Sequence, residues 1–268
     1  MSTTDDNNEE FLRLLARHDP AIRAYVRASI PDPADVADVM QNVSVIAWKK
    51  FSVLDNPETD FGRWACVIAR YEIMKFRRGK ARDRLVLDPD IVERIADEGI
   101  EEAPERESWI KALQYCMEKL PESRRALLVE AYHPDSSIKE LAAEMDKKPN
   151  ALYQTLSRLR LSLVDCIERQ TRQQSTRIRH FPQTHFPYSF FPEPMTAEQD
   201  QLLCRYLDGR LSPEDKEALQ ELLRSSAVAR RRLRMLAAVT EGISSGEVTA
   251  RASTAKSTIL ATPNKLLL

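Results

Sequence analysis

Amide and cationic side chains that suit contacts with DNA recur through residues 147–160. Amide and guanidinium groups bond bidentately to adenine or guanine edges in the major groove, and lysines suit phosphates. Leucines recur at helical spacing from 152 to 163, which leaves the polar groups on the other face of one helix. We expect this face to read duplex DNA through Lys147, Lys148, Asn150, Gln154, Ser157 and Arg158, with Arg160 as a further phosphate contact.

A shorter helix precedes this one. Ser137 and Glu140 have the spacing of a capping box, and apolar residues then recur at helical spacing as far as Met145. Three polar residues break the pattern before Pro149, which suits the first turn of a new helix. Residues 136–163 therefore predict a helix-turn-helix. An ordinary helical hairpin with a solvated polar face is the alternative that these residues alone leave open.

A second group of cations lies upstream, between residues 63 and 84. Arg63, Arg70 and Arg77 recur every seven residues, so they line one face of a predicted helix that Asp60 would cap. Such a positive ridge is typical of surfaces that follow phosphates, although a solvated basic face on a core helix would have the same pattern.

An earlier helix carries acids and amides on its outer side. Asp32 suits its N-cap and Pro33 its first position, and apolar residues from 36 to 47 form its buried stripe. The polar residues on the outer side are Asp35, Asp38, Gln41 and Asn42.

The composition favours an all-α fold, because six glycines in 268 residues leave little material for hairpin turns or phosphate-binding loops. The net charge is −1, but the sign reverses along the chain, and residues 85–107 read as an acidic, flexible linker. The four cysteines stand far apart, which predicts buried free thiols in a reducing cytoplasm rather than a disulfide or a zinc site. We expect a soluble protein with no signal peptide, because no apolar run approaches the roughly 20 residues of a membrane span.

The C-terminal third predicts further segments. Prolines and aromatics in residues 169–195 indicate an extended tether. We expect a helical segment over residues 196–240, in which Ser212 caps a helix, and a disordered tail over residues 241–268. The helical segment is similar to the helical N-terminal part of anti-sigma factors, without the zinc motif that some of them carry, and a plain stabilising appendage is the alternative. Its basic residues are expected to lie on the acidic linker or on DNA, and they are Arg224, Arg230, Arg231, Arg232 and Arg234.

With these motifs in order, residues 9–168 resemble the extracytoplasmic-function class of bacterial sigma factors, in the sigma-70 family. Residues 35–51 are similar to the family's polymerase-binding helix, with Asp38, Gln41 and Trp48 at matching places. Residues 61–78 resemble the adjoining segment, but Tyr71 stands where the family usually has Asn. Residues 120–163 are similar to the fourth region, except that Asp146 to Lys148 replace the usual glycine in the turn.

The resemblance implies a region 2-like domain over 1–84 and a region 4-like domain over 108–168, with no enzymatic activity and no cofactor or metal. The first domain would bind the clamp coiled coil of RNA polymerase core and the melted minus-ten strand, and the second would bind the flap and the minus-thirty-five element. The acidic linker would occupy a basic channel of the polymerase until RNA displaces it. An anti-sigma factor, or residues 196–240 in cis, would regulate these contacts. The implied minus-ten contacts are Arg63, Arg70, Tyr71, Lys75, Arg77 and Arg78.

Three other interpretations remain. A helix-turn-helix repressor or activator would bind operator DNA without polymerase, but it leaves the basic ridge unexplained. An enzyme or nucleotide-binding module lacks support, because the chain has no phosphate loop and its four histidines suggest no catalytic arrangement. A sigma-like protein that serves only as a regulatory adaptor is the third.

Overall fold

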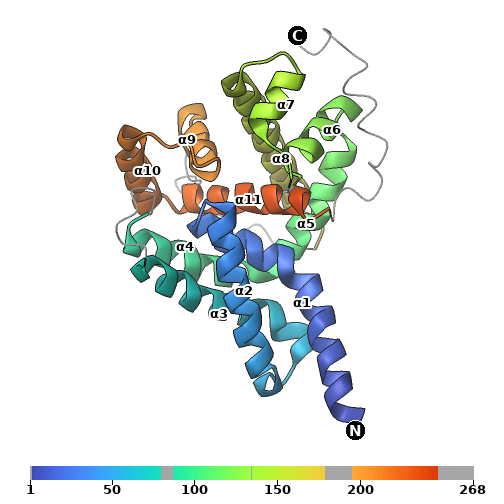
Figure 1. The fold of residues 1–268 in the computed structure, drawn as a ribbon. Helices are drawn as coiled ribbons and strands as arrows, with labels where there is room; N and C mark the ends of the chain where they lie inside the picture. The colour runs from blue at the N-terminus through green and yellow to red at the C-terminus, as the bar shows by residue number, and fades with distance from the viewer. Residues whose placement is uncertain (1, 80–86, 134, 179–194, 247–268) are drawn as a thin grey trace. The chain divides into compact units, whose positions relative to one another are not determined.

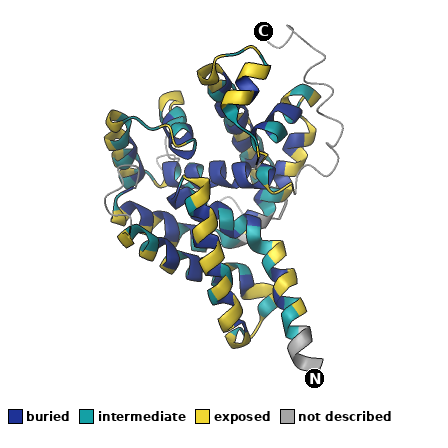
Figure 2. Ribbon diagram, viewed as in Figure 1, coloured by how far each residue is buried: buried dark blue, intermediate teal, exposed yellow. Residues whose placement is uncertain are grey.

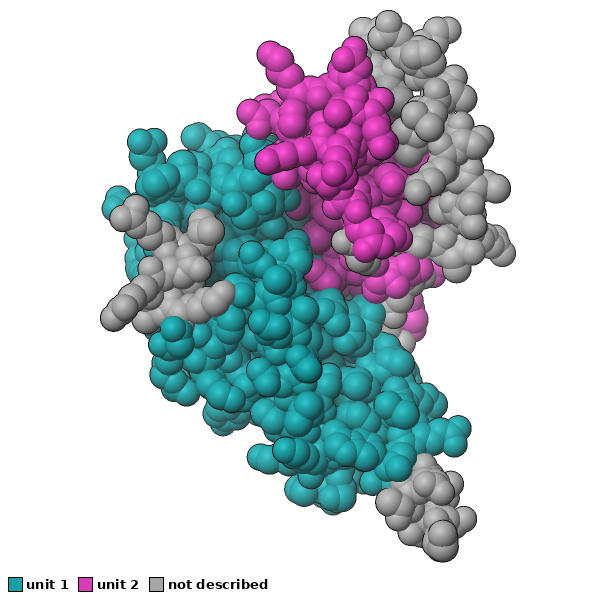
Figure 3. Space-filling model, viewed as in Figure 1, with its two compact units in different colours: residues 1–107, 184–238 teal, residues 108–183, 239–268 magenta. Residues whose placement is uncertain are grey.

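The computed structural model describes residues 2–79, 87–133, 135–178 and 195–246. Every regular element in these ranges is a helix, so the all-α prediction is confirmed. The chain forms two compact units, residues 1–107 with 184–238 and residues 108–183 with 239–268 (Figure 3). None of the described helices combines the length and apolar character that a membrane crossing requires.

Three helices begin the first unit: α1 (Ser2–Ser29), α2 (Pro33–Lys50) and α3 (Pro57–Gly79). Each packs against the other two, as Figure 1 shows, and the short 3₁₀ helix η1 (Phe51–Val53) leads from α2 toward α3. Helix α3 begins three residues before the cap predicted at Asp60, which lies within its first turn.

The core of these helices is aromatic at one end and aliphatic along α2. Phe11, Phe51 and Phe61 pack edge to face, with ring centroids 5.2 to 6.1 Å apart. This geometry suits the ring quadrupoles. The predicted Asp32 cap is confirmed, since its carboxylate accepts a 2.8 Å hydrogen bond from the backbone N–H of Ala34. The predicted stripe of α2 is buried, and its members are Val36, Val39, Met40, Val43 and Ala47.

In place of the flexible linker expected over 85–107, the structure has helix α4 (Pro89–Glu101) followed by the start of α5 (Ala103–Glu118). Ile91 and Ile95 of α4 are fully buried, and α4 packs against α1 and α3. Acidic residues and Arg94 occupy most of the rest of the helix surface. Apolar spacing therefore decides that this highly charged segment forms a packed helix.

Gly99, within the segment expected to be a flexible linker, has a packing role. A Cβ at this position would lie 2.8 Å from Cδ2 of Tyr25, closer than real contacts allow. The backbone oxygen of Gly99 accepts a 2.5 Å hydrogen bond from Arg106, which is itself buried and lies over the Tyr25 ring. The glycine thus allows α4 to approach α1 closely.

The C-terminal segment, residues 195–238, completes the first unit with α9 (Ala197–Leu207), α10 (Pro213–Ser225) and most of α11 (Ala227–Ser244). The Ser212 cap is confirmed, because its hydroxyl accepts from the backbone N–H of Asp215 at 3.1 Å. Helix α10 packs against both α9 and α4.

The second unit contains the end of α5, then α6 (Glu122–Ala131), α7 (Ile138–Glu144) and α8 (Pro149–Ile178). Helices α6 and α7 both pack against α8. Helix α8 continues through Ile178, into the segment expected to be an extended tether. The remainder of that tether, 179–194, and the tail from residue 247 lie outside the described residues.

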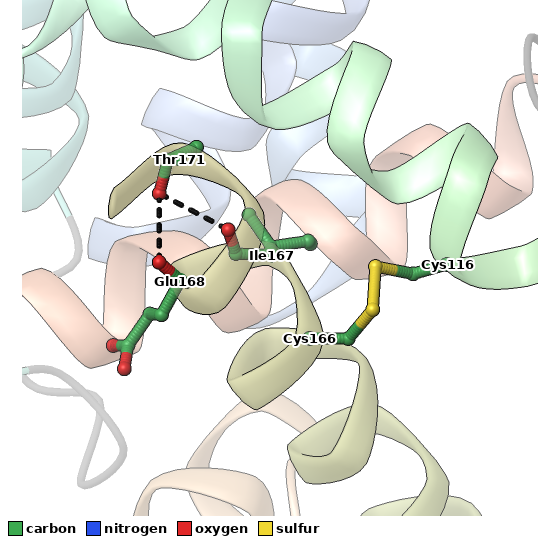
Figure 4. The surroundings of a disulfide bond; sticks show 5 residues. All are labelled: Cys116, Cys166, Ile167, Glu168 and Thr171. Atoms are coloured by element: carbon green, nitrogen blue, oxygen red, sulfur yellow. Dashed lines mark hydrogen bonds between the residues drawn. A yellow bond between two sulfur atoms is a disulfide. The ribbon is translucent and has the colours of Figure 1, made fainter. Parts of the chain in front are cut away.

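A disulfide joins Cys116 of α5 to Cys166 of α8 (Figure 4). The prediction of four free thiols is therefore wrong for this pair, whereas Cys66 and Cys204 are free and buried as expected. The two bonded cysteines are 50 residues apart, so nothing in their local spacing could reveal the bond.

Candidate polymerase and nucleic-acid interface

The outer side of α2 presents the predicted polymerase-binding residues. Asp38, Gln41 and Asn42 are exposed, and Asp35 is half-buried in the first turn. Figure 2 shows the exposed side of α2 in yellow. Because the opposite side of α2 supplies the aliphatic stripe of the core, this acidic and amide face is held in a fixed orientation. Such a face can accept hydrogen bonds from arginine or lysine side chains of a partner protein.

Apolar groups extend this surface at the other end of the same helices. Trp48 is 44% exposed and Val53 is 75% exposed, although Trp48 also contacts Phe11 with ring centroids 5.0 Å apart. Leu12 of α1 is 62% exposed. Sequence reasoning singled out Trp48 alone, because exposed apolar residues in a helical pattern look the same as buried ones.

Four of the six predicted minus-ten residues lie on the solvent side of α3. Tyr71 is 64% exposed, and Lys75 makes a 3.1 Å ion pair with Glu72. An exposed tyrosine ring among cations suits a single strand, since bases stack on the ring while the cations meet phosphates. The four residues are Arg63, Tyr71, Lys75 and Arg78.

The other two, Arg70 and Arg77, are engaged within the protein. Arg70 donates to Asp97 at 2.6 Å and to Glu93 at 2.8 Å, and the bond to Asp97 chiefly raises the pKa of Arg70. Arg77 is half-buried and donates to the backbone oxygen of Leu87, and burial lowers its pKa. The seven-residue ridge is therefore not a free row of cations in this structure.

The turn between α7 and α8 has the geometry that a helix-turn-helix needs. Asp146 adopts a left-handed φ of 52°, and Lys147 donates its N–H to the oxygen of Ala142 at 2.8 Å, which closes the end of α7. Aspartate tolerates this conformation better than most residues, so it serves where glycine is usual. The predicted capping box is absent, because the Ser137 side chain makes no cap hydrogen bond.

The predicted reading face is largely exposed at the start of α8. Lys148, Asn150, Gln154 and Arg158 are exposed, and Lys147 is half-buried. These residues provide amides and cations on one side of a helix whose first residue is Pro149.

Ser157 and Arg160 do not belong to that face. Ser157 is 4% exposed and Arg160 is fully buried. Arg160 donates to the Ser157 hydroxyl at 3.3 Å and lies over the Tyr132 ring, 5.9 Å from its centroid. Their assignment as DNA contacts is corrected here, because both side chains are buried and Arg160 lies over Tyr132, the residue that follows α6, instead of facing solvent.

Within the described part of the chain, no group of three or more His, Cys, Asp or Glu side chains is arranged to hold a metal ion. The surfaces described above are built from amides, carboxylates, cations and the exposed ring of Tyr71.

Comparison with known proteins concerns the surfaces on α2 and α3. Residues 14–83 match the family model for Sigma-70 region 2, and the match spans α2 and α3 with both of their candidate faces. A search of curated proteins and a search of solved structures found no significant match. Residues 14–83 are therefore similar to Sigma-70 region 2, and this match supports a relationship of that segment to the sigma-70 family.

Proposed function

We propose that this protein is an extracytoplasmic-function sigma factor that binds RNA polymerase core and directs it to specific promoters. The observation that carries the proposal is the region 2 match over residues 14–83, which contains the exposed acidic and amide face of α2. In this proposal the protein works in the cytoplasm, where the polymerase and promoters are, and it needs no cofactor.

In the first step of this function, α2 binds the clamp coiled coil of the largest polymerase subunit. Asp38, Gln41 and Asn42 would accept or donate hydrogen bonds across that interface, and Asp35 would add charge at its edge. Helix α3 then holds the melted minus-ten strand. Base stacking on an exposed ring such as Tyr71 contributes about 1–3 kcal/mol per base, enough to offset part of the cost of unstacking.

The second unit would bind the minus-thirty-five element and the polymerase flap. The exposed residues Asn150, Gln154 and Arg158 support major-groove readout, and Lys148 supports a phosphate contact at the edge of the groove. In this proposal, region 2-like function belongs to residues 1–84 and region 4-like function to residues 108–168.

The test is copurification of the full-length Asp38→Arg/Gln41→Ala variant with core polymerase. Both side chains are exposed, so the fold should persist while core binding is lost. Glu217→Arg, an equal charge reversal on the exposed side of α10, is the matched control and should bind core normally. Wild-type binding by the double variant with native circular dichroism would move the docking surface elsewhere.

Transcription from candidate promoters by purified core with this protein separates the proposal from its main alternative. A helix-turn-helix regulator that acts without core would bind duplex DNA alone and would not support promoter-specific initiation. A regulatory adaptor would bind core without directing initiation.

A further inference from the structure

The C-terminal end of α4 gathers negative charge where a helix tolerates it least. Glu98 and Glu102 are four positions apart, as are Glu101 and Glu105. Like charges at this spacing meet across one turn of helix and repel. The negative end of the helix dipole lies at the same place, and the last turn of α4 contains no basic residue. This end of the helix therefore depends on cations from another part of the chain.

Two buried arginines of α11 supply such cations. Arg230 and Arg234 share Glu98 at 2.6 and 2.8 Å, and Arg234 also lies 2.6 Å from Glu102. Arg230 is 6% exposed and Arg234 is 3% exposed. A guanidinium group at that depth is costly unless it is paired, so α11 can pack here only with these glutamates beside it. The dependence is mutual, because the same two arginines neutralise the crowded acids of α4.

A third arginine extends the contact beyond the end of α4. Arg231 lies 3.2 Å from Glu102 and 2.8 Å from Glu105, which already belongs to α5. The arginines thus meet carboxylates on both sides of the point where α4 ends and α5 begins. We call the three arginines and the three glutamates that they meet the arginine cluster, which consists of Arg230, Arg231, Arg234, Glu98, Glu102 and Glu105.

The arginine cluster joins two helices that continue from the first unit into the second. Helix α5 passes the division between the units after residue 107, and α11 passes it after residue 238. Among the described helices, only these two cross that division. The cluster itself lies within the first unit. It therefore ties together, at their first-unit ends, the two described helices through which the chain reaches the second unit.

We infer that the arginine cluster is a latch that sets the length of the connection between the two units. While it is closed, residues 97–105 stay helical. When it opens, the acids lose their cations and this stretch becomes the flexible linker that its charge favours.

The change in length is large on the scale of a promoter. The eight steps from residue 97 to residue 105 span about 12 Å as a helix and up to about 28 Å when extended. The difference of about 16 Å equals about five base pairs of duplex DNA. The inference rests on the proposed function for its biological meaning, the spacing of the minus-ten and minus-thirty-five elements, but its physical claim concerns the helix alone.

The test compares two single variants of the full-length protein, Arg231→Gln and Arg224→Gln. The two arginines are a matched pair, because each side chain is 40% exposed and each meets two carboxylates of the acidic segment. The partners of Arg224 are Asp88 and Asp90, at the start of α4, where the positive end of the helix dipole favours acids even without a partner. Arg224→Gln is therefore the control.

The measurement is hydrogen exchange of the backbone amides between residues 99 and 105. One of these amides, that of Glu102, donates to the oxygen of Glu98 at 3.0 Å and is protected only while the end of α4 is formed. We expect Arg231→Gln to speed this exchange by about threefold or more, as the loss of two partly exposed ion pairs allows. Arg224→Gln should leave it at the wild-type rate.

A charge swap guards against an effect of general misfolding. The side chains of Arg231 and Glu105 are 40% and 53% exposed, so both positions tolerate substitution. Arg231→Glu should speed exchange further than Arg231→Gln, because it adds another acid beside Glu102. Adding Glu105→Arg should slow it again. Rescue of this kind requires the contact between α11 and α5 and does not follow from a general loss of structure.

Transcription by core polymerase measures the consequence, on promoters whose two elements are moved apart or together by up to three base pairs. Wild type and Arg224→Gln should prefer one spacing. Arg231→Gln should use the altered spacings about threefold better or more, relative to the preferred one, because its connection varies in length.

Equal exchange rates in Arg231→Gln and Arg224→Gln would overturn the inference, and so would a charge swap that exchanges as fast as Arg231→Glu alone. Faster exchange in Arg231→Gln with an unchanged spacing preference would show that this stretch does not set the length of the connection. If no form of the protein supported transcription, the proposed function would fail, while the exchange rates would still decide whether the cluster holds the helix.

Discussion

Arg230 donates two hydrogen bonds to a single carboxylate oxygen of Glu98, from Nε at 2.8 Å and from Nη2 at 2.6 Å. The other oxygen of Glu98 accepts from Arg234 at 2.8 Å. One carboxylate of α4 therefore pairs with two buried guanidinium groups of α11, and Glu102 supplies a second negative charge by accepting from Arg234 at 2.6 and 2.7 Å. Charge-assisted hydrogen bonds of this kind are stronger than those between neutral groups. They explain why the C-terminal segment packs in a defined position on the acidic helix α4.

Stability should depend on pH through Glu98. Burial alone would raise the pKa of Glu98, but the bonds from Arg230 and Arg234 outweigh it, and the pKa lies below the ordinary value of 4.5. The stabilisation is thus fully present above about pH 4.5 and is lost as pH falls through the lowered pKa. Glu98→Gln should lower the free energy of unfolding by about 1–2 kcal/mol at pH 7.

The measurement is thermal unfolding of wild type and Glu98→Gln between pH 3 and 8. The difference in midpoint should be constant at neutral pH and should shrink as pH falls below about 4.5, because Glu98 is protonated first in the unfolded chain and, below its lowered pKa, also in the folded protein. Glu217→Gln, on an exposed position of α10, is the control and should show no such trend. A difference that grew on acidification would refute the assigned direction of the pKa shift.

Tyr206 should tolerate loss of its hydroxyl but not of its ring. Among the described residues, the buried hydroxyl has no hydrogen-bond partner, so Tyr206→Phe should change stability by less than about 1 kcal/mol or increase it. Tyr206→Ala should cost about 3–5 kcal/mol, because it leaves a large cavity in place of a buried ring. Urea unfolding of both variants checks this, and a large cost for Tyr206→Phe would indicate an unrecognised partner for the hydroxyl.

The acidic segment shows where sequence reasoning succeeded and failed. The all-α class, the Asp32 cap and the Ser212 cap were predictable because each depends on residues within one turn of helix. The acidic segment is predicted wrongly because its charge suggests a flexible linker, whereas the spacing of Ile91 and Ile95, which are buried one turn apart, indicates a helix. Its partners lie more than 120 residues away, and local patterns do not identify such pairs.

The turn of the helix-turn-helix offers a local test at Asp146. Its φ of 52° lies in the left-handed region, where residues other than glycine lose about 1–2 kcal/mol. Asp146→Gly should therefore be neutral or stabilising by up to about 1 kcal/mol, after the added flexibility of the unfolded chain is included. Asp146→Val should be clearly destabilising, because a β-branched residue fits this region poorly. Thermal unfolding distinguishes the two, and equal effects would argue against a left-handed turn.

Ser157 and Arg160 show a second limit of prediction from the sequence. The helical repeat places Ser157 at the edge between the polar and the buried side of α8, so sequence alone could not decide its exposure. Arg160 was assigned from its charge, whereas in the structure its charge is used within the protein, beside Ser157 and over Tyr132. The exposure of a residue at such an edge depends on the neighbour that packs there, and for Arg160 the neighbours are Ser157 and Tyr132, which follows α6.

The exposure of Gln154 and Arg158, compared with the burial of Ser157, yields a prediction about DNA readout. Gln154→Ala and Arg158→Ala should each weaken binding to the preferred upstream sequence by about 1–3 kcal/mol and relax specificity, because their exposed side chains face the groove in the proposed function. Ser157→Ala should leave the sequence profile unchanged, and Lys148→Ala should weaken all sequences alike. Selection from a library of upstream sequences measures all four. An unaltered profile for Gln154→Ala and Arg158→Ala would show that the reading face lies elsewhere.

The disulfide between Cys116 and Cys166 should stabilise the second unit. It links positions 50 residues apart, so chain entropy predicts a contribution of about 4 kcal/mol. Reductant should lower the urea midpoint of wild type and leave Cys166→Ser unchanged, whereas Cys204→Ser should still respond because Cys204 is free. Thiol titration of the unfolded, unreduced protein should find two free groups, Cys66 and Cys204. Four titratable thiols would mean that the bond had not formed, and the reductant should then have no effect on the midpoint.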